Sequence, residues 1–317
     1  MKKVLLAQSI YAPAIELLEQ HAEVVLIKEG NMDEFKKHLS DAYAVIIGTS
    51  IKFTKELIDM ASNLKVISRT GVGVDNIDVA TATERGIYVL NTPGVNSLSV
   101  AEHTVMLICA LAKHVIFLDD EVRNHRYGSR RLYLPIDLQG KKLGLIGCGR
   151  IGRMVAEKCM RAFDMEVIGY DPLISAVPES IQLVDSIEEV FTDADFISLH
   201  VPFTENTRNL VDNRLLSLMK SSAFLINTSR GGIVDETVLA SKLKEKKIAG
   251  AALDVFSKEP PDPSSELLNL PNVILTPHTA ALTQECTARV AMEAAKGVVD
   301  LIQNKIPKFI YNKEGVL

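Results

Sequence analysis

The stretch Lys141-Lys-Leu-Gly-Leu-Ile-Gly147-Cys-Gly149-Arg-Ile-Gly152 places the pattern G-x-G-x-x-G directly after an apolar, strand-like run. An amphipathic, helix-like segment follows. In such a strand–turn–helix unit, Gly147 permits the tight turn, Gly149 lets the backbone approach a pyrophosphate, and Gly152 allows close helix–strand packing. The pyrophosphate would lie at the helix N-terminus, where unpaired N–H groups favour an anion. The sequence therefore predicts a dinucleotide-binding turn.

An acid stands where this kind of unit requires one. Asp171 follows the next apolar run, Val167–Tyr170, and lies nineteen residues beyond Gly152. A carboxylate at this place accepts hydrogen bonds from the adenosine ribose hydroxyls and repels a 2′-phosphate. No Arg or Lys directly follows Asp171, so the sequence favours NAD over NADP. The alternative is a glycine turn with a capping aspartate that binds no nucleotide.

Short apolar runs alternate with amphipathic segments along the whole chain. The apolar runs predict strands at Val4–Ala7, Val24–Ile27, Ala44–Ile47, Val66–Ser68, Ile87–Leu90, Lys142–Ile146, Glu166–Tyr170, Phe196–His200, Ala223–Asn227, Ala249–Leu253 and Val273–Leu275. The segments between them predict helices at Pro13–Gln20, Asp33–Leu39, Thr54–Ala61, Asn76–Thr83, Arg150–Arg161, Ser186–Phe191 and Thr237–Lys244. Longer helices are expected from about Ser97 to Val122 and from Thr283 to about Gln303. This alternation predicts an α/β protein whose parallel sheets carry helices on both faces.

Length and composition limit the classes of protein and partner. The chain has 317 residues, enough for two domains of roughly 150 residues each. Its hydrophobic fraction of 47% is ordinary for a globular protein, and its net charge of −5 leaves no basic surplus for nucleic-acid phosphates. The most apolar run, Val105–Ala112, is far too short to cross a bilayer, and the four cysteines show no paired spacing. We therefore expect a cytoplasmic protein without a metal and without nucleic-acid or membrane partners.

Three polar residues follow predicted strands in the second half of the chain. Arg230 lies in the segment after Ala223–Asn227, Glu259 in the segment after Ala249–Leu253, and His278 just after Val273–Leu275. In an open α/β sheet, ligands bind beyond the carboxyl ends of the strands. We therefore expect these side chains at the same sheet edge as the glycine turn.

These residue types suit the oxidation of an alcohol beside a carboxylate. The forked guanidinium of Arg230 can hold a carboxylate by two parallel hydrogen bonds. An imidazole such as His278 can move the hydroxyl proton, because imidazole titrates near neutrality. A carboxylate on its other nitrogen, Glu259, would fix the tautomer and favour the imidazolium. The hydride chemistry would belong to nicotinamide. Taken singly, the same residues could be an ion-paired Arg, a surface acid and a His bonded to backbone.

Several motifs, in order along nearly the whole chain, resemble those of the D-isomer-specific 2-hydroxyacid dehydrogenase family, most closely its D-3-phosphoglycerate dehydrogenase branch. Besides the glycine turn, the matching segments are Ser68–Asp78, Asn91–Glu102, His200–Pro202, Asn227–Glu236, Ala251–Pro260 and Thr276–Ala281. The resemblance implies two doubly wound parallel-sheet domains. Residues 1–98, completed by 283–317, would form a flavodoxin-like substrate domain, and residues 99–282 a Rossmann-type NAD-binding domain.

The resemblance also assigns roles to residues. Arg230 would bind the substrate carboxylate and carbonyl, His278 would be the acid/base, and Glu259 its partner. Val72 and Gly73 would offer backbone N–H groups to the substrate carboxylate. The residues implied to line the NAD site are Gly147, Gly149, Arg150, Ile151, Gly152, Asp171, Val201, Thr228, Asp254 and His278, with Thr104 joining them from the long helix.

The implied function is NAD-dependent hydride transfer to or from a small D-2-hydroxy acid or 2-keto acid, in a homodimer formed through the NAD-binding domain. Within the family, the alternatives are phosphoglycerate dehydrogenase-like activity and reduction of hydroxypyruvate or glyoxylate. A different class, a non-enzymatic NAD-sensing scaffold similar to the C-terminal-binding-protein corepressors, shares the fold and the three polar residues.

One departure from the family pattern concerns a phosphorylated substrate. Phosphoglycerate enzymes of the family typically carry an Arg at the end of the third strand, where this chain reads Ile47-Gly48-Thr49-Ser50. We therefore expect an unphosphorylated substrate to be accepted at least comparably. Arginines within 123–131 could replace the missing cation, although a solvated run of charge is the simpler interpretation.

Overall fold

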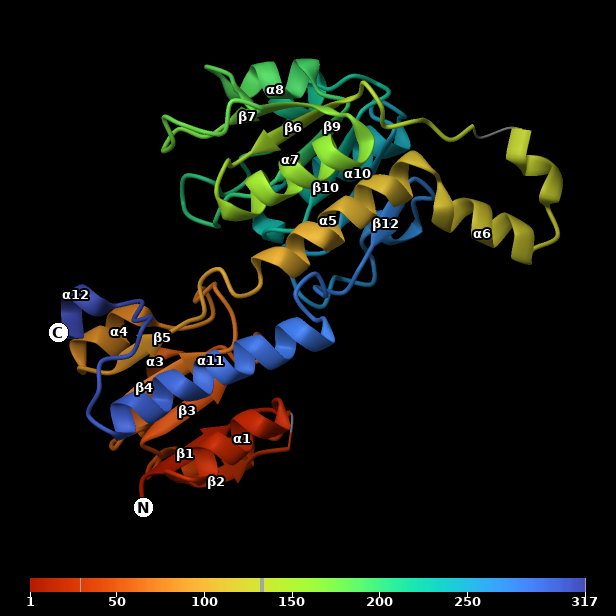
Figure 1. Cartoon of the computed structure of the whole chain (residues 1–317). Helices are drawn as coiled ribbons and strands as arrows, with labels where there is room; N and C mark the ends of the chain where they lie inside the picture. Colours follow the sequence, from red (N-terminus) through yellow and green to blue (C-terminus); the bar gives the residue numbers. More distant parts are fainter. Residues whose placement is uncertain (29, 132–133, 317) are drawn as a thin grey trace. The chain divides into compact units, whose positions relative to one another are not determined.

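The computed structural model describes residues 1–28, 30–131 and 134–316. The chain divides into two compact units, one made of Met1–Asn96 with Leu282–Leu317 and the other of Ser97–Ala281. The sequence analysis placed these boundaries after residues 98 and 282. Each unit is built around one sheet with helices on both faces (Figure 1).

The first unit contains a five-stranded parallel sheet in the order β2-β1-β3-β4-β5. Its strands are β1 (Lys3–Leu6), β2 (Glu23–Leu26), β3 (Ala44–Ile47), β4 (Val66–Arg69) and β5 (Tyr88–Leu90). One face is covered by α2 (Met32–Leu39), α3 (Lys55–Met60) and α4 (Val79–Glu84), and the other by α1 (Ala12–Glu19) and α11 (Gln284–Ile302). A short last helix, α12 (Lys313–Val316), was not predicted. The strand order is the flavodoxin-like one, which confirms the predicted fold class.

The second unit contains a seven-stranded parallel sheet in the order β12-β11-β10-β9-β6-β7-β8. Its strands are β6 (Lys142–Ile146), β7 (Glu166–Tyr170), β8 (Gln182–Leu183), β9 (Phe196–Leu199), β10 (Phe224–Asn227), β11 (Gly250–Leu253) and β12 (Val273–Leu275). One face is covered by α5 (Ser97–Ala112) and α7 (Arg150–Phe163), and the other by α8 (Ile187–Asp193), α9 (Asn213–Leu218) and α10 (Glu236–Lys244). Short 3-10 helices in the described part of this unit are η1 (Tyr127–Arg131), η2 (Gly231–Ile233) and η3 (Glu266–Asn269). This is the Rossmann-type order, and the winding reverses between β6 and β9, where ligands bind in such sheets.

The strands of this sheet are continuous apolar runs because helices cover both of its faces. All four residues of β9, β10 and β11 are buried. Parallel strands covered by helices on both faces read as unbroken apolar runs, because neither face of the sheet meets water. Asn227 ends β10 and Asp254 directly follows β11, so buried polar residues gather at these strand ends, which is where the candidate site lies.

The prediction of one helix from Ser97 to Val122 is wrong. The helix breaks at His114, whose φ of 50° lies in the left-handed region and cannot continue a right-handed helix. Two helices result, α5 and α6 (Val115–Arg123), bent by 58°. Figure 1 shows α6 projecting away from the sheet of its own unit, followed by η1. The sequence did not reveal this break, because no Gly or Pro marks it.

Among the described residues, no single helix is long and apolar enough to cross a membrane. The bent pair of α5 and α6 passes that test together, by length and composition only. Ten of the residues of α5 are buried.

Candidate active site

The glycine turn joins β6 to α7 at the reversal point of the second sheet. Gly147 has a φ of 96°, and a Cβ there would lie 2.6 Å from the His200 carbonyl oxygen. A Cβ on Gly152 would lie 2.3 Å from the Gly147 carbonyl oxygen. Gly149 is the N-cap of α7, and a Cβ there would meet no atom within 4 Å. The fold itself requires glycine at residues 147 and 152, whereas Gly149 leaves open space beside a helix N-terminus, which suits an approaching pyrophosphate.

His200, at the end of β9, lies directly beneath this turn. Its Nε2 is 2.9 Å from Ser198 Oγ, and a Cβ on Gly152 would lie 3.4 Å from its ring atom Cδ2. Burial lowers the pKa of His200 to about 4, so the ring is neutral at physiological pH. Sequence reasoning quoted this residue only as part of a motif. The signal that could have revealed it is a His at the end of the strand that neighbours the glycine turn.

Asp171 follows β7 and is tied to the same turn. Its Oδ2 accepts a hydrogen bond from the Cys148 N–H at 2.9 Å, and its Oδ1 accepts one from the Leu173 N–H at 3.0 Å. The Cys148 thiol is fully buried, which raises its pKa to about 11, so its role is packing. The structure thus places Asp171 at the edge where the ribose hydroxyls of a dinucleotide bind.

A cation missed by the sequence analysis lies beside this loop. Arg153, in the first turns of α7, donates from Nε to the Cys148 carbonyl at 2.7 Å and from Nη2 to the Ala176 carbonyl at 2.9 Å. The sequence argument for NAD rests on the residues that follow Asp171, whereas Arg153 belongs to α7. These two hydrogen bonds join the glycine turn to the segment after β7. The preference for NAD over NADP stays a prediction.

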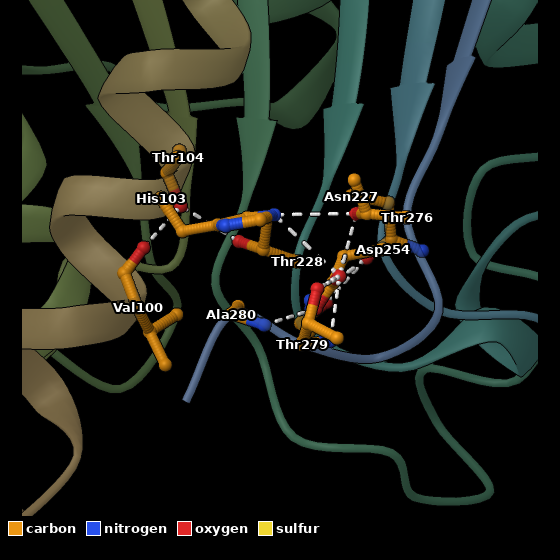
Figure 2. A network of polar contacts seen from close by, with 10 residues as sticks. Val100, His103, Thr104, Asn227, Thr228, Asp254, Thr276, Thr279 and Ala280 are labelled. Atoms are coloured by element: carbon orange, nitrogen blue, oxygen red, sulfur yellow. Dashed lines mark hydrogen bonds and ion pairs between the residues drawn. The ribbon is translucent and has the colours of Figure 1, made fainter. Parts of the chain in front are cut away.

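The other residues predicted to line the NAD site fall into two groups. Arg150 is exposed and Ile151 half-buried in the first turn of α7, and Val201 is half-buried just after β9. Thr104 and Thr228 instead form a buried pair (Figure 2). Thr104 Oγ1 lies 2.8 Å from Thr228 Oγ1 and is 2.8 Å from the Val100 carbonyl oxygen, to which it donates.

Asp254, at the end of β11, is fully buried and is part of the same network (Figure 2). Its carboxylate accepts hydrogen bonds from the Thr276 hydroxyl at 2.6 Å and from the Thr279 and Ala280 N–H groups, both at 2.9 Å. This carboxylate therefore holds the segment that carries His278. Sequence reasoning treated Asp254 as a residue lining the cofactor site and did not foresee this tether.

His278 and Glu259 form a direct pair. His278 Nδ1 lies 2.7 Å from Glu259 Oε2, and Glu259 Oε1 accepts a hydrogen bond from the Phe256 N–H at 3.1 Å. The two side chains are 30% and 37% exposed, so the pair faces solvent at the edge of the second unit. The structure thus brings together two of the three residues predicted to be catalytic.

The charge of Arg230 also acts on the Glu259 carboxylate. Burial raises the pKa of Glu259, but the hydrogen bond and charge of His278, the Phe256 N–H and the charge of Arg230 outweigh it and hold that pKa below its usual range. The Glu259 carboxylate therefore stays ionised at neutral pH.

Asn227, another residue missed earlier, supports the loop that carries Arg230. Asn227 is 1% exposed and ends β10. Its Oδ1 accepts from the Ser229 N–H at 3.0 Å and the Ser229 hydroxyl at 2.8 Å, while its Nδ2 donates to the Arg230 carbonyl at 2.9 Å. The side chain thereby forms an Asx turn, which an Asn at a strand end before Ser and Arg could have suggested.

Val72 and Gly73 belong to the first unit, in the loop after β4. The Asn91 side chain donates a hydrogen bond to the Val72 carbonyl at 2.8 Å. This contact uses the carbonyl of Val72 and not its N–H. The proposed contact of these N–H groups with a substrate carboxylate remains a prediction.

Comparison with known proteins places these features in a family. Residues 105–280 match the sequence model for the D-isomer specific 2-hydroxyacid dehydrogenase, NAD binding domain. The hydroxypyruvate reductase of Thermotoga maritima is 38% identical over 288 residues, covering 90% of this chain and 93% of that protein. The D-3-phosphoglycerate dehydrogenase of Methanocaldococcus jannaschii is 40% identical over 319 residues, but the chain spans only 60% of its length.

Solved structures agree. The D-lactate dehydrogenase of Aquifex aeolicus, complexed with NAD and lactic acid, has a TM-score of 0.88 at 28% identity and covers 98% of this chain, with 99% of its own chain covered. The family match includes the glycine turn, Asp171 and all three candidate catalytic residues. The chain belongs to the D-isomer specific 2-hydroxyacid dehydrogenase family.

Proposed function

We propose that this protein is an NAD-dependent oxidoreductase that transfers a hydride between nicotinamide and a small D-2-hydroxy acid or 2-keto acid. The observation that carries the proposal is the 2.7 Å pair of His278 and Glu259, with the Arg230 charge acting on the same carboxylate. The pair lies in the unit that matches the family's NAD-binding domain, at the edge where the strands of a Rossmann-type sheet end.

The side chains have separate tasks in this reaction. Arg230 binds and orients the substrate carboxylate, because its planar fork matches two carboxylate oxygens. His278 Nδ1 is engaged by Glu259, so Nε2 is the nitrogen that gives a proton to the forming alkoxide or takes it from the hydroxyl. The Glu259 anion stabilises the imidazolium. NAD(H), held by the glycine turn and Asp171, would supply the hydride chemistry.

We further propose that the preferred substrates are unphosphorylated, with hydroxypyruvate and glyoxylate first. Gly48 provides no cation at the place where the phosphoglycerate branch carries Arg. Arg123 and Arg126 do not replace it readily, since Arg123 pairs with Asp119 at 2.6 Å and Arg126 pairs with Glu121 at 2.6 Å. A dianionic phosphate would have to compete with these carboxylates.

The test is a substrate panel. NADH oxidation would be followed at 340 nm with a protein concentration on the order of micromolar. The substrates would be hydroxypyruvate, glyoxylate, pyruvate and phosphohydroxypyruvate, and kcat/KM would be determined for each. We expect turnover of at least one unphosphorylated keto acid at a kcat of about 1 s⁻¹ or more, within the usual enzyme range. Binding of NADH without turnover of any keto acid would favour the corepressor-like scaffold instead.

We also propose a cytoplasmic homodimer formed through the second unit. Support comes from α6 and the segment after it, where the side chains of Val115, Ile116, Val122, Tyr127 and Leu134 are 50% to 71% exposed. An apolar projection of this kind is costly in water and is typical of an interface. Light scattering during size-exclusion chromatography would distinguish a dimer from the 34.8 kDa monomer.

A further inference from the structure

Asp254 holds the segment around His278 through its buried carboxylate and its main-chain carbonyl. Asp254 Oδ1 accepts from the Thr279 N–H, and its Oδ2 accepts from the Ala280 N–H, both at 2.9 Å. The main-chain carbonyl of Asp254 accepts from the His278 N–H at 2.7 Å. His278 has a φ of 53°, in the left-handed region, which a residue other than glycine keeps only where its surroundings hold it.

A second histidine contacts this carboxylate from α5 (Figure 2). His103 Nε2 lies 3.2 Å from Thr276 Oγ1 and 3.5 Å from Asp254 Oδ1, and its side chain is 16% exposed. The one hydroxyl hydrogen of Thr276 is donated to Asp254 at 2.6 Å, so towards His103 this hydroxyl can only accept. His103 Nε2 therefore carries a proton, and donation runs from His103 through Thr276 to Asp254.

We propose that His103 is a positioning residue for His278. Its N–H completes the set of donors around the buried Asp254 carboxylate, and this carboxylate fixes the turn Thr276–Ala280 in the conformation that aligns the His278 ring with Glu259. Without the N–H, the half-buried Thr276 hydroxyl and the fully buried Asp254 carboxylate lose a nearby donor, and the turn loosens. What His278 does once aligned rests on the proposed function, whereas the tether does not.

The experiment measures the turn directly and then turnover. Amide hydrogen exchange of the segment 275–282 would be compared in the cofactor-free wild type, His103→Leu and His103→Gln, since the Gln amide places an N–H donor at a reach similar to Nε2. In His103→Leu we expect these amides to exchange about 10-fold faster, because local protection follows the local opening equilibrium. We also expect kcat to be about 10-fold lower, with the KM for NADH changed less than about 2-fold, because a small misplacement of a reacting group costs rate more than binding. His103→Gln restores both.

The matched control is Glu102→Gln, on the same helix. Glu102 Oε1 pairs with Lys158 Nζ at 3.3 Å rather than with the network, so this variant should behave as wild type. If His103→Leu fails to fold, Thr276→Val carries the same test by breaking the relay at its centre. Where His103→Leu folds, adding it to Thr276→Val should cause little further loss, because both changes act on one chain of hydrogen bonds.

Three outcomes would overturn the proposal. They are unchanged exchange of segment 275–282 in folded His103→Leu, failure of His103→Gln to restore protection, and an additive loss in the double variant. Faster exchange in His103→Leu, in a protein whose wild type reduces no keto acid, would support the tether and count against the proposed function alone.

Discussion

His278 Nδ1 lies 2.7 Å from Glu259 Oε2, although the two residues are separated by 19 positions and follow different strands. The segment after β11 brings Glu259, and the turn after β12 brings His278. Parallel pairing of these adjacent strands places both segments at one edge of the sheet. Because Glu259 engages Nδ1 of His278, Nε2 is the ring nitrogen left to exchange a proton with the substrate.

Replacing His278 by Ala should lower kcat by about 10²- to 10⁴-fold, the usual contribution of a general acid–base group. The fold should persist, because the side chain is 30% exposed. Steady-state kinetics would be combined with a measurement of NADH binding, which should change little. A purified, folded variant with near-wild-type turnover would contradict the assigned role.

Replacing Glu259 by Gln should shift the pH profile of keto-acid reduction. The pKa of Glu259 is held below its usual range, so the carboxylate is an anion throughout the assay range and stabilises the protonated imidazole. Reduction needs that proton and declines as pH rises. Without the anion, the imidazolium loses its proton more readily, and the alkaline limb of kcat should move to lower pH. An unmoved limb would mean that Glu259 does not act on His278 in this way.

Replacing Asn227 by Ala should loosen the loop that carries Arg230. The variant loses the acceptor for the Ser229 N–H and the donor to the Arg230 carbonyl, and it leaves buried groups unpaired. We expect the free energy of unfolding to fall by about 1–3 kcal/mol, and kcat/KM for the keto acid to fall more than NADH affinity. Asn227→Asp is the informative comparison, since it keeps the acceptor and lacks the donor. Unchanged kcat/KM in a destabilised Asn227→Ala protein would limit its role to stability.

Replacing Asp171 by Ala should narrow the preference for NAD(H) over NADP(H). The carboxylate repels a 2′-phosphate, while Arg153 beside the same loop is already committed to the carbonyls of Cys148 and Ala176. The wild type should therefore show a higher kcat/KM with NADH than with NADPH, and the variant a smaller ratio. Equal kcat/KM with NADH and NADPH in the wild type would mean that Arg153, rather than Asp171, determines the choice of cofactor at this edge.

Replacing Gly48 by Arg should shift substrate preference towards phosphohydroxypyruvate. A charge-assisted hydrogen bond of about 1.5–3 kcal/mol corresponds to a change of about 10- to 150-fold in kcat/KM ratio. A Cβ at residue 48 would lie 2.4 Å from Gln8 Oε1, so the half-exposed Gln8 side chain must move. The double variant Gln8→Ala/Gly48→Arg removes that obstacle and should show the larger shift. If the wild type already strongly prefers phosphohydroxypyruvate, the proposed preference for unphosphorylated substrates is wrong. Arg130 and Arg131 would then be the next candidates for the cation that binds the phosphate.

The residues near the strand ends were predictable because local pattern and topology coincide there. The strand-like run before Gly147, the spacing to Asp171 and the positions of Arg230, Glu259 and His278 after strands all follow from residue order. Parallel sheets bring the carboxyl ends of such strands to one edge. The break at His114 was not predictable in this way, because it is a backbone conformation without a Gly or Pro to mark it.

The sequence by itself determined the α/β class, the glycine turn and the set of reactive residue types. Only the tertiary structure decided which polar groups support them. His200 beside Gly152, Arg153 bound to the Ala176 carbonyl, and His103 with Thr276 around Asp254 join elements that are distant in sequence. Hydrogen bonds between such elements depend on distances of about 3 Å that strand order and helix packing set, and no residue spacing along the chain encodes them.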